Sequence, residues 1–275
     1  MQPACSRGET VSRLAAMSTP IAGKVVLISG ASSGIGRMTA LALGRLHARV
    51  ALASRREELL HDVAREVGDL GGEPLVVPTD VADDDQIRGL VRATIDRWER
   101  IDIVIGSAGI WHHSAIEDTS LERWQEVMRI DFLANVSLTL AALPHMGPGG
   151  QFIFINSLEG KRGVPFEGAY TSAKHALTGF ASVARQEFAS RGIAVTGIHP
   201  GRIDTALIER LDVPSVQRKG PAGAVASAVV SAIRRPRPEV YVPAVRGRLY
   251  AWFGTLAPAF TDRLLAPFHL EGRMD

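Results

Sequence analysis

Two side chains that can move a proton stand four positions apart in this sequence of 275 residues: Tyr170 and Lys174. If the segment that carries them is helical, the phenol and the ammonium share one helix face. A neighbouring ammonium favours the phenolate, so we expect Lys174 to lower the pKa of Tyr170 from about 10. Ser157 adds a hydroxyl just after the apolar run at residues 152–155. Together the three groups predict proton transfer to and from a carbonyl oxygen.

A glycine-rich stretch near the start of the chain predicts what this proton transfer accompanies. The β-branched run at 24–28 is followed by Ser29-Gly30-Ala31-Ser32-Ser33-Gly34-Ile35-Gly36 and then by a helical pattern. A strand, a glycine turn and a helix start can hold a pyrophosphate, because glycine lets the backbone approach closely and the helix N-terminus faces the anion. The spacing Gly-x-x-x-Gly-x-Gly differs from the commoner Gly-x-Gly-x-x-Gly, and alone it also fits a plain turn. In its setting it predicts dinucleotide binding by Gly30, Ser32, Ser33, Gly34, Ile35 and Gly36.

Two arginines indicate which dinucleotide is bound. Arg55 and Arg56 follow the predicted strand at 49–54, at the position that meets the adenosine ribose. There an arginine suits a 2′-phosphate, whereas an acid suits a 2′-hydroxyl. The alternative is that both are solvated first-turn residues of the next helix, where cations are unfavourable. We therefore expect NADP(H) in preference to NAD(H), with Arg37 as an additional contact.

The elements that position these groups predict one α/β fold. Helical patterns alternate with strands predicted at 24–28, 49–54, 75–79, 101–105, 152–156, 193–198 and 240–242. This alternation predicts a single Rossmann-type doubly wound parallel sheet of about seven strands with helices on both faces, and ligands at the carboxyl ends of the strands. The long helical patterns include 120–143 and 169–191. Further cofactor contacts expected at the strand ends are Asp80, Val81, Ser107, Ala108, Gly109, Pro200 and Gly201.

Some of these residues have a second interpretation. Asp80 is a candidate to hydrogen-bond the adenine amino group or to cap a turn, and Asp83, Asp84 and Asp85 are predicted to cap a helix start. Asp131 lies among apolar residues at helical spacing, where a buried carboxylate needs a partner. It is either part of the site or a polar residue that kinks the helix or lies in an interface.

Three segments are predicted along the chain: a disordered N-terminal extension over 1–20, a catalytic domain over 21–245 that binds NADP and substrate, and an apolar, aromatic helical extension over 246–275. Met17 is an alternative start of translation. The polar stretch 202–220 is long enough to form a mobile lid. The C-terminal extension has three interpretations: a cap over the substrate site, a subunit contact, or an amphipathic contact with a membrane surface.

Composition excludes several classes of function. A formal net charge of +2 gives no basic field for nucleic acid. The single cysteine, Cys5, excludes a disulfide framework and a cysteine-rich metal site, and indicates a reducing compartment, so we expect a cytoplasmic protein. The sequence contains no run of 18 apolar residues, so no transmembrane segment is predicted. The adjacent His112 and His113 lack a nearby carboxylate pair, so no metal site is expected.

The residues named so far resemble the short-chain dehydrogenase/reductase family over about residues 22–245. The resemblance rests on the glycine loop, on Ser157 thirteen residues before Tyr170, on Lys174, and on Pro200-Gly201 with Thr205 beyond. It implies that Tyr170 is the general acid/base and that Ser157 holds the substrate oxygen. It also implies that Lys174 binds the nicotinamide ribose, that Ile203 and Thr205 hold the carboxamide, and that the enzyme is a homodimer or homotetramer.

Two departures from the family pattern affect the site. Gly106-Ser107-Ala108-Gly109 replaces the usual Asn-Asn-Ala-Gly, and Asp131 stands where the family usually has the asparagine of a catalytic tetrad. Such an asparagine helps to hold a water that links the lysine to solvent, and an aspartate would alter that relay.

The expected function is an NADP(H)-dependent carbonyl reductase or alcohol dehydrogenase acting on a ketone, aldehyde or alcohol, with Trp111, Glu159 and Phe166 beside Ser157 in the substrate pocket. The alternative is a catalytically impaired NAD(P)-binding regulatory protein.

Overall fold

A seven-stranded parallel sheet forms the centre of the molecule. The computed structural model describes residues 20–209, 211–213, 218–265 and 272–274. The strand order is β10-β6-β5-β4-β1-β2-β3, and every pair is parallel. This order confirms the predicted doubly wound fold, because the direction of winding reverses between β1 and β4. The strands are β1 (Val25–Ser29), β2 (Arg49–Ser54), β3 (Glu73–Pro78), β4 (Ile103–Gly106), β5 (Gln151–Ile155), β6 (Ala194–Pro200) and β10 (Glu239–Val242).

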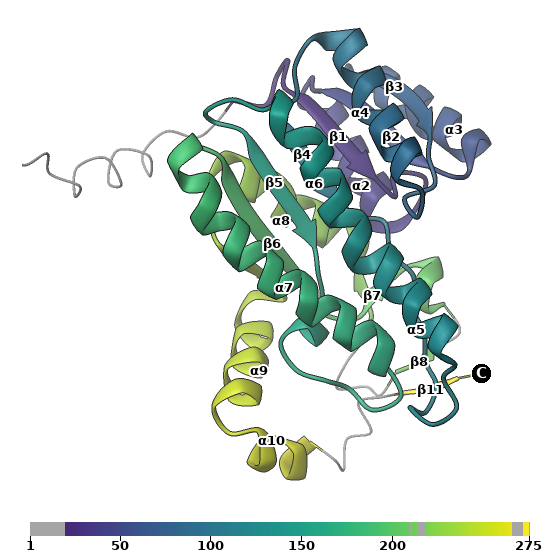
Figure 1. Ribbon diagram of the computed structural model, residues 1–275, viewed down its shortest axis with the longest axis vertical. Helices are drawn as coiled ribbons and strands as arrows, with labels where there is room; N and C mark the ends of the chain where they lie inside the picture. The colour runs from purple at the N-terminus through teal and green to yellow at the C-terminus, as the bar shows by residue number, and fades with distance from the viewer. Residues whose placement is uncertain (1–19, 210, 214–217, 266–271, 275) are drawn as a thin grey trace, which may run out of the picture.

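Helices cover both faces of the sheet (Figure 1). On one face lie α2 (Gly34–Gly44), α3 (Glu57–Asp69) and α8 (Ala222–Arg234). On the other lie α4 (Asp84–Trp98), α6 (Ala134–Ala142) and α7 (Gly168–Phe188), with α5 (Leu121–Met128) packed on α7. Short 3-10 turns are η2 (Leu143–His145), η3 (Leu158–Gly160), η4 (Ala189–Arg191) and η5 (Ala206–Ile208).

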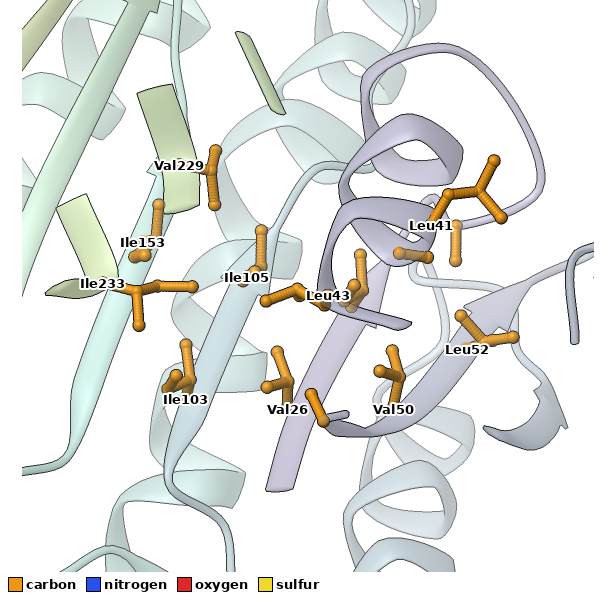
Figure 2. Close-up of a cluster of buried hydrophobic side chains, with 14 of the residues drawn as sticks. Val26, Leu41, Leu43, Val50, Leu52, Ile103, Ile105, Ile153, Val229 and Ile233 are labelled. Atoms are coloured by element: carbon orange, nitrogen blue, oxygen red, sulfur yellow. The ribbon is translucent and has the colours of Figure 1, made fainter. Parts of the chain in front are cut away.

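The apolar runs of the five inner strands are buried on both sides, as expected for a sheet covered by two helix layers, and the edge strands β3 and β10 are partly buried. Alternate residues of one strand face different cores: Val26 and Ile28 pack with α2 and α8, whereas Val25 and Leu27 pack with α4 and α6. Figure 2 shows part of the first core, where Val229 and Ile233 of α8 and Leu43 of α2 meet the strands.

The prediction of one continuous helix over 120–143 is wrong. Helix α5 ends at Met128, a π-helical turn spans Arg129–Leu133, and α6 begins at Ala134. The Ala134 N–H donates to the carbonyl of Arg129, five residues earlier. The π-helical turn centres on the buried Asp131. Of the two interpretations of Asp131, the one in which it distorts the helix therefore agrees with the backbone. By length and composition alone the stretch Leu121–His145 is long and apolar enough to cross a membrane, but in this domain it forms a core layer.

The segment 202–220 is more ordered than predicted. β7 (Ile203–Asp204) pairs with β9 (Gly220–Pro221), and β8 (Leu211–Asp212) pairs with β11 (Arg273–Met274) near the C-terminus. Residues 210 and 214–217 of the predicted lid lie outside the described residues, as do residues 1–19 of the predicted N-terminal extension. The lid therefore stays a prediction.

Two helices follow the last sheet strand, α9 (Ala244–Leu256) and α10 (Pro258–Leu265), below the sheet in Figure 1. Arg162, just after η3, ties them to the domain. Its Nη2 donates to Asp262 at 2.6 Å, and its guanidinium lies 5.5 Å from the ring centre of Tyr250. Large apolar side chains remain exposed on these helices, Trp252 and Phe260 among them.

The contact between Gly106 and Asn135 leads to a prediction about stability. A Cβ at Gly106 would lie 1.9 Å from Oδ1 of Asn135. Gly106→Ala is therefore expected to destabilise the protein by about 1–3 kcal/mol through overpacking. Chemical denaturation measures this change.

Gly89→Ala is the matched control, since a Cβ at this position of α4 meets open space and should raise stability by about 0.5–1 kcal/mol. The double variant Gly106→Ala/Asn135→Ala should lose less stability than the sum of the two single variants. Strict additivity would contradict the proposed clash.

Candidate active site

A cavity of about 450 Å³ opens along the carboxyl ends of the strands. It passes from the glycine loop, across the crevice between β1 and β4, to Tyr170. All but two of the residues predicted to hold cofactor or substrate line it, and the exceptions are Phe166 and Arg37. The lining includes Gly30, Ser32, Ser33, Gly34, Ile35, Gly36, Arg55, Asp80, Val81, Ser107, Ala108, Gly109, Asp131, Ser157, Tyr170, Lys174, Pro200, Gly201, Ile203 and Thr205, together with Trp111 and Glu159.

The glycine loop leaves space and free donors for an anion. Gly30 has φ +71°, and a Cβ there would meet the backbone nitrogen of Ala108 at 2.7 Å. A Cβ at Gly36 would lie 2.2 Å from the carbonyl oxygen of Gly30. Helix α2 begins at Gly34 with no side-chain cap at Ser33 and no acid in its first turn. Its first N–H groups are thus available to a phosphate, so the loop fits a dinucleotide pyrophosphate.

The loops after β1 and β4 are tied together by one hydroxyl. Oγ of Ser29 accepts hydrogen bonds from the N–H groups of Ser107 and Ala108 at 3.1 and 3.2 Å. The departure at Gly106 also has a structural reason, because the amide of Asn135 fills the space that a side chain at 106 would need.

The arginines after β2 differ in their contacts. Arg55 and Arg56 both line the cavity, and Nη2 of Arg56 donates to Oγ of Ser32 at 2.8 Å and of Ser33 at 2.6 Å. Arg56 precedes α3, whose first turn carries Glu57 and Glu58, so the arginines are not first-turn residues of that helix.

Arg37 does not take the expected role of an additional contact. It donates instead to both carboxylate oxygens of Glu66, at 2.8 and 2.7 Å.

The acids after β3 act mainly on the backbone. Oδ1 of Asp80 accepts from the N–H of Ala82 at 2.9 Å, as its turn-capping interpretation predicts, although Asp80 also lines the cavity. Asp83 caps α4, because its side chain accepts from the N–H groups of Asp85 and Gln86.

A buried ion pair lies next to Tyr170. Nζ of Lys174 is 3.2 Å from Oδ2 of Asp131 and 5.3 Å from the ring centre of Tyr170. Oδ1 of Asp131 accepts from the N–H of Ile110 at 2.7 Å. Burial raises the pKa of Asp131, while Lys174 and the Ile110 N–H oppose that shift. The ammonium is thus paired with a carboxylate inside the domain.

The prediction that the pKa of Tyr170 is lowered is wrong for the protein alone. Burial raises it well above the usual value, and the nearby Glu159 and Asp131 raise it further. A hydrogen bond with Ser157 acts in the opposite direction. Desolvation and negative charge both disfavour the phenolate, and Asp131 offsets the ammonium on which the prediction relied. Tyr170 therefore remains a phenol at neutral pH.

Ser157 is held by its neighbours on three elements. Its N–H donates to Oδ1 of Asn156 at 2.8 Å, and its Oγ accepts from the N–H of Glu159 at 3.1 Å. Nδ1 of His199, at the end of β6, lies 3.1 Å from the Ser157 carbonyl, and Asn156 also donates to Thr178 of α7. A hydroxyl accepts and donates at the same time, so Ser157 keeps its own proton for donation, and Tyr170 is one hydrogen-bond partner of its side chain.

The structure adds two residues at the substrate end that sequence reasoning missed, Glu167 and Arg202. They form a buried ion pair, and Nε1 of Trp111 donates to Oε2 of Glu167 at 2.9 Å. No local pattern marked either residue, since their pairing joins the start of α7 to the loop after β6.

Phe166 lies outside the cavity lining and is partly exposed, with φ +63°. Its ring stacks on His113 at 5.5 Å. His112 instead accepts from Nε of Arg123 at 3.3 Å. Within the part of the chain that the structure describes, no three His, Cys, Asp or Glu side chains gather as metal ligands.

Comparisons with known proteins agree with this geometry. The family model described as "short chain dehydrogenase" matches residues 24–213. The chain is 31% identical over 255 residues to the "Dehydrogenase/reductase SDR family protein 7-like" of Anopheles gambiae, covering 86% of this chain and 80% of that protein. It is 33% identical over 202 residues to the "3-oxoacyl-[acyl-carrier-protein] reductase" of a Synechocystis species, covering 72% and 81%.

A solved short chain dehydrogenase from Burkholderia cenocepacia, in complex with NADP, matches with a TM-score of 0.75 and 25% identity, over 81% of this chain and 97% of that one. The chain therefore belongs to the short-chain dehydrogenase/reductase family and is an NAD(P)-dependent dehydrogenase or reductase.

The electrostatics of Tyr170 lead to a prediction. The chain has three tyrosines, so Tyr241→Phe/Tyr250→Phe leaves Tyr170 alone to report by phenolate absorbance. In that background Asp131→Asn should move the onset of ionisation to lower pH, because a charge that opposes the phenolate is removed. The exposed Glu122→Gln of α5 is the control. If the ionisation of Tyr170 began at the same pH in the Asp131→Asn variant, this explanation of the Tyr170 pKa would be contradicted.

Proposed function

We propose that this protein is an NADP(H)-dependent reductase of a ketone or aldehyde in which Tyr170 is the general acid. The observation that carries the proposal is that Ser157, Tyr170 and Lys174 line one cavity that continues into the glycine loop. The raised pKa of Tyr170 supports the direction of reduction, because the phenol keeps its proton until a carbonyl oxygen takes it.

The side chains have distinct tasks in this mechanism. A bound nicotinamide supplies the hydride. Ser157 donates a hydrogen bond to the substrate oxygen, and Tyr170 gives its proton to the same oxygen as negative charge develops there. Lys174 orients the nicotinamide ribose, and Asp131 together with the Ile155 carbonyl, 3.4 Å from Nζ, fixes the position of the ammonium. Ile203 and Thr205 line the same cavity and serve the carboxamide.

Tyr170→Phe tests the proposal. It removes the transferable proton and keeps the ring, so kcat for NADPH oxidation with a carbonyl panel should fall by about 10²–10⁴-fold. NADPH binding, followed by fluorescence, should be retained. Turnover near the wild-type rate would refute the role of Tyr170. NADPH binding by the wild type with no turnover on any carbonyl would instead favour the alternative, an impaired NAD(P)-binding regulatory protein.

The preference for NADP(H) is a separate part of the proposal. Arg55 and Arg56 are exposed at the adenosine end of the cavity, where guanidinium groups can bind a 2′-phosphate in bidentate fashion. The NADP complex of the Burkholderia relative is consistent with this preference.

Arg55→Ala/Arg56→Ala is expected to weaken NADPH binding about tenfold or more, as charge-assisted hydrogen bonds to the phosphate are lost, and to change NADH binding little. Titration with both cofactors measures the ratio of the dissociation constants. Arg65→Ala is the control, since this exposed arginine of α3 pairs with Asp62 away from the cavity. An equal loss for both cofactors would contradict the assignment.

We also propose a homo-oligomer formed through α5, α6 and α7. The support is the set of apolar side chains exposed on these helices and on the π-helical turn between α5 and α6, namely Leu121, Leu133, Leu140 and Val183.

A further inference from the structure

Three charged side chains are buried together in the substrate end of the cavity. Glu159 comes from η3, Glu167 directly precedes α7, and Arg202 follows Gly201 after β6. Their side chains are 9%, 0% and 7% exposed, respectively. Both Glu159 and Arg202 line the cavity that holds Tyr170.

The two carboxylates are not equally satisfied. Oε1 of Glu167 pairs with Nη2 of Arg202, and its Oε2 accepts from Nε1 of Trp111 at 2.9 Å. Glu159 has a longer ion pair, with Oε1 3.7 Å from Nη1 of Arg202. Oε2 of Glu159 is buried and accepts no hydrogen bond from a described N–H or O–H donor, and the Glu159 carboxyl lies close enough to that of Glu167 for the two to share a proton. Such a pair of acids is costly inside a protein unless a proton or a ligand of opposite charge compensates it.

The charges around Glu159 leave one carboxylate without a matching cation. Arg202 balances one of the two acids. Two other cations at this end of the site are already paired, Lys174 with Asp131 at 3.2 Å and Arg162 with Asp262 at 2.6 Å. Tyr170 and Tyr250, which also interact with Glu159, are phenols whose pKa values burial raises. Burial, the charge of Glu167 and a side-chain hydrogen bond with Glu167 raise the pKa of Glu159 well above its usual value. Binding of a proton by this pair of carboxyl groups is therefore favoured in the protein alone.

We propose that the carbonyl substrate carries a positively charged ammonium group, which binds Glu159 in place of that proton. This inference rests on the proposed reductase function and adds the class of its substrate. On binding, the O–H bond of Glu159 breaks and the proton passes to solvent, while the cation takes its place as counter-ion. The indole of Trp111 offers an additional cation–π surface at the same end of the cavity. An anionic substrate is disfavoured, because Arg202 is already engaged by two carboxylates.

Two alcohols of the same shape test this inference. Choline and 3,3-dimethylbutan-1-ol differ in one charged atom, and their binding to the NADPH-saturated enzyme, where an alcohol cannot react, is measured by calorimetry. Choline should bind about tenfold more tightly or better. Repeating the titration in buffers of different ionisation enthalpy should show about one proton released for choline and none for the neutral alcohol.

Glu159→Gln should bring the ratio of the two dissociation constants close to one and abolish the proton release. The control variant Asp204→Asn, which removes an exposed acid of β7, should leave the ratio of the dissociation constants and the proton release unchanged. Equal binding of the two alcohols, absence of choline binding, or a choline preference that survives Glu159→Gln would overturn the inference.

Turnover separates this result from the proposed function. NADPH oxidation with neutral carbonyls and no preference for choline would support the reductase and refute the ammonium site. A choline preference with proton release, but no NADPH oxidation by any carbonyl, including trimethylammonioacetaldehyde, would support the ammonium site and refute the reductase.

Discussion

The ion pair between Lys174 and Asp131 constrains the centre of the active site. Two charges with side chains only 5% and 0% exposed are stable only when each compensates the other and their remaining hydrogen bonds are made. The Ile110 N–H and the Ile155 carbonyl supply these, and the π-helical turn between α5 and α6 surrounds the carboxylate. Gly109 contributes by its small size, because a Cβ there would contact both carboxylate oxygens at 3.3 Å. The loop after β4, the broken helix and α7 therefore depend on one pair of charges.

Local sequence was sufficient for the sheet and for the position of the glycine loop along the cavity. A short run of β-branched residues between turn residues predicts a strand of a sheet that is covered on both faces. The glycines at 30, 34 and 36 predict a loop in which the backbone turns tightly and can approach a bound pyrophosphate. Parallel winding then brings all strand ends to one edge, so residues distant in the sequence could be assigned to one cavity before their contacts were known. The sheet order and the cavity lining agree with that logic.

What local sequence could not predict depends on contacts between distant segments. The π turn follows from the burial of Asp131 and from the hydrogen bond of Asn135 to its carbonyl, and a helical pattern carries no sign of either. The pKa of Tyr170 was predicted in the wrong direction because only its helix neighbour Lys174 was visible in the sequence. Glu159 approaches from η3 and Asp131 from the broken helix, and both oppose the phenolate. Arg202 and Glu167 were missed for the same reason.

The segment after β5 connects these electrostatics to the C-terminal helices. Ser157, Glu159 and Arg162 lie within this short segment, which carries the proposed substrate-binding hydroxyl at one end and contacts α9 and α10 at the other. Tyr250 of α9 feels the charges of Glu159 and Arg202, and a Cβ at Gly247 would touch Leu158 at 3.2 Å. None of the described residues of α9 or α10 lines the cavity itself. The two helices therefore contact the site through the segment that carries Ser157, since Arg162 and Leu158 of this segment pack against them.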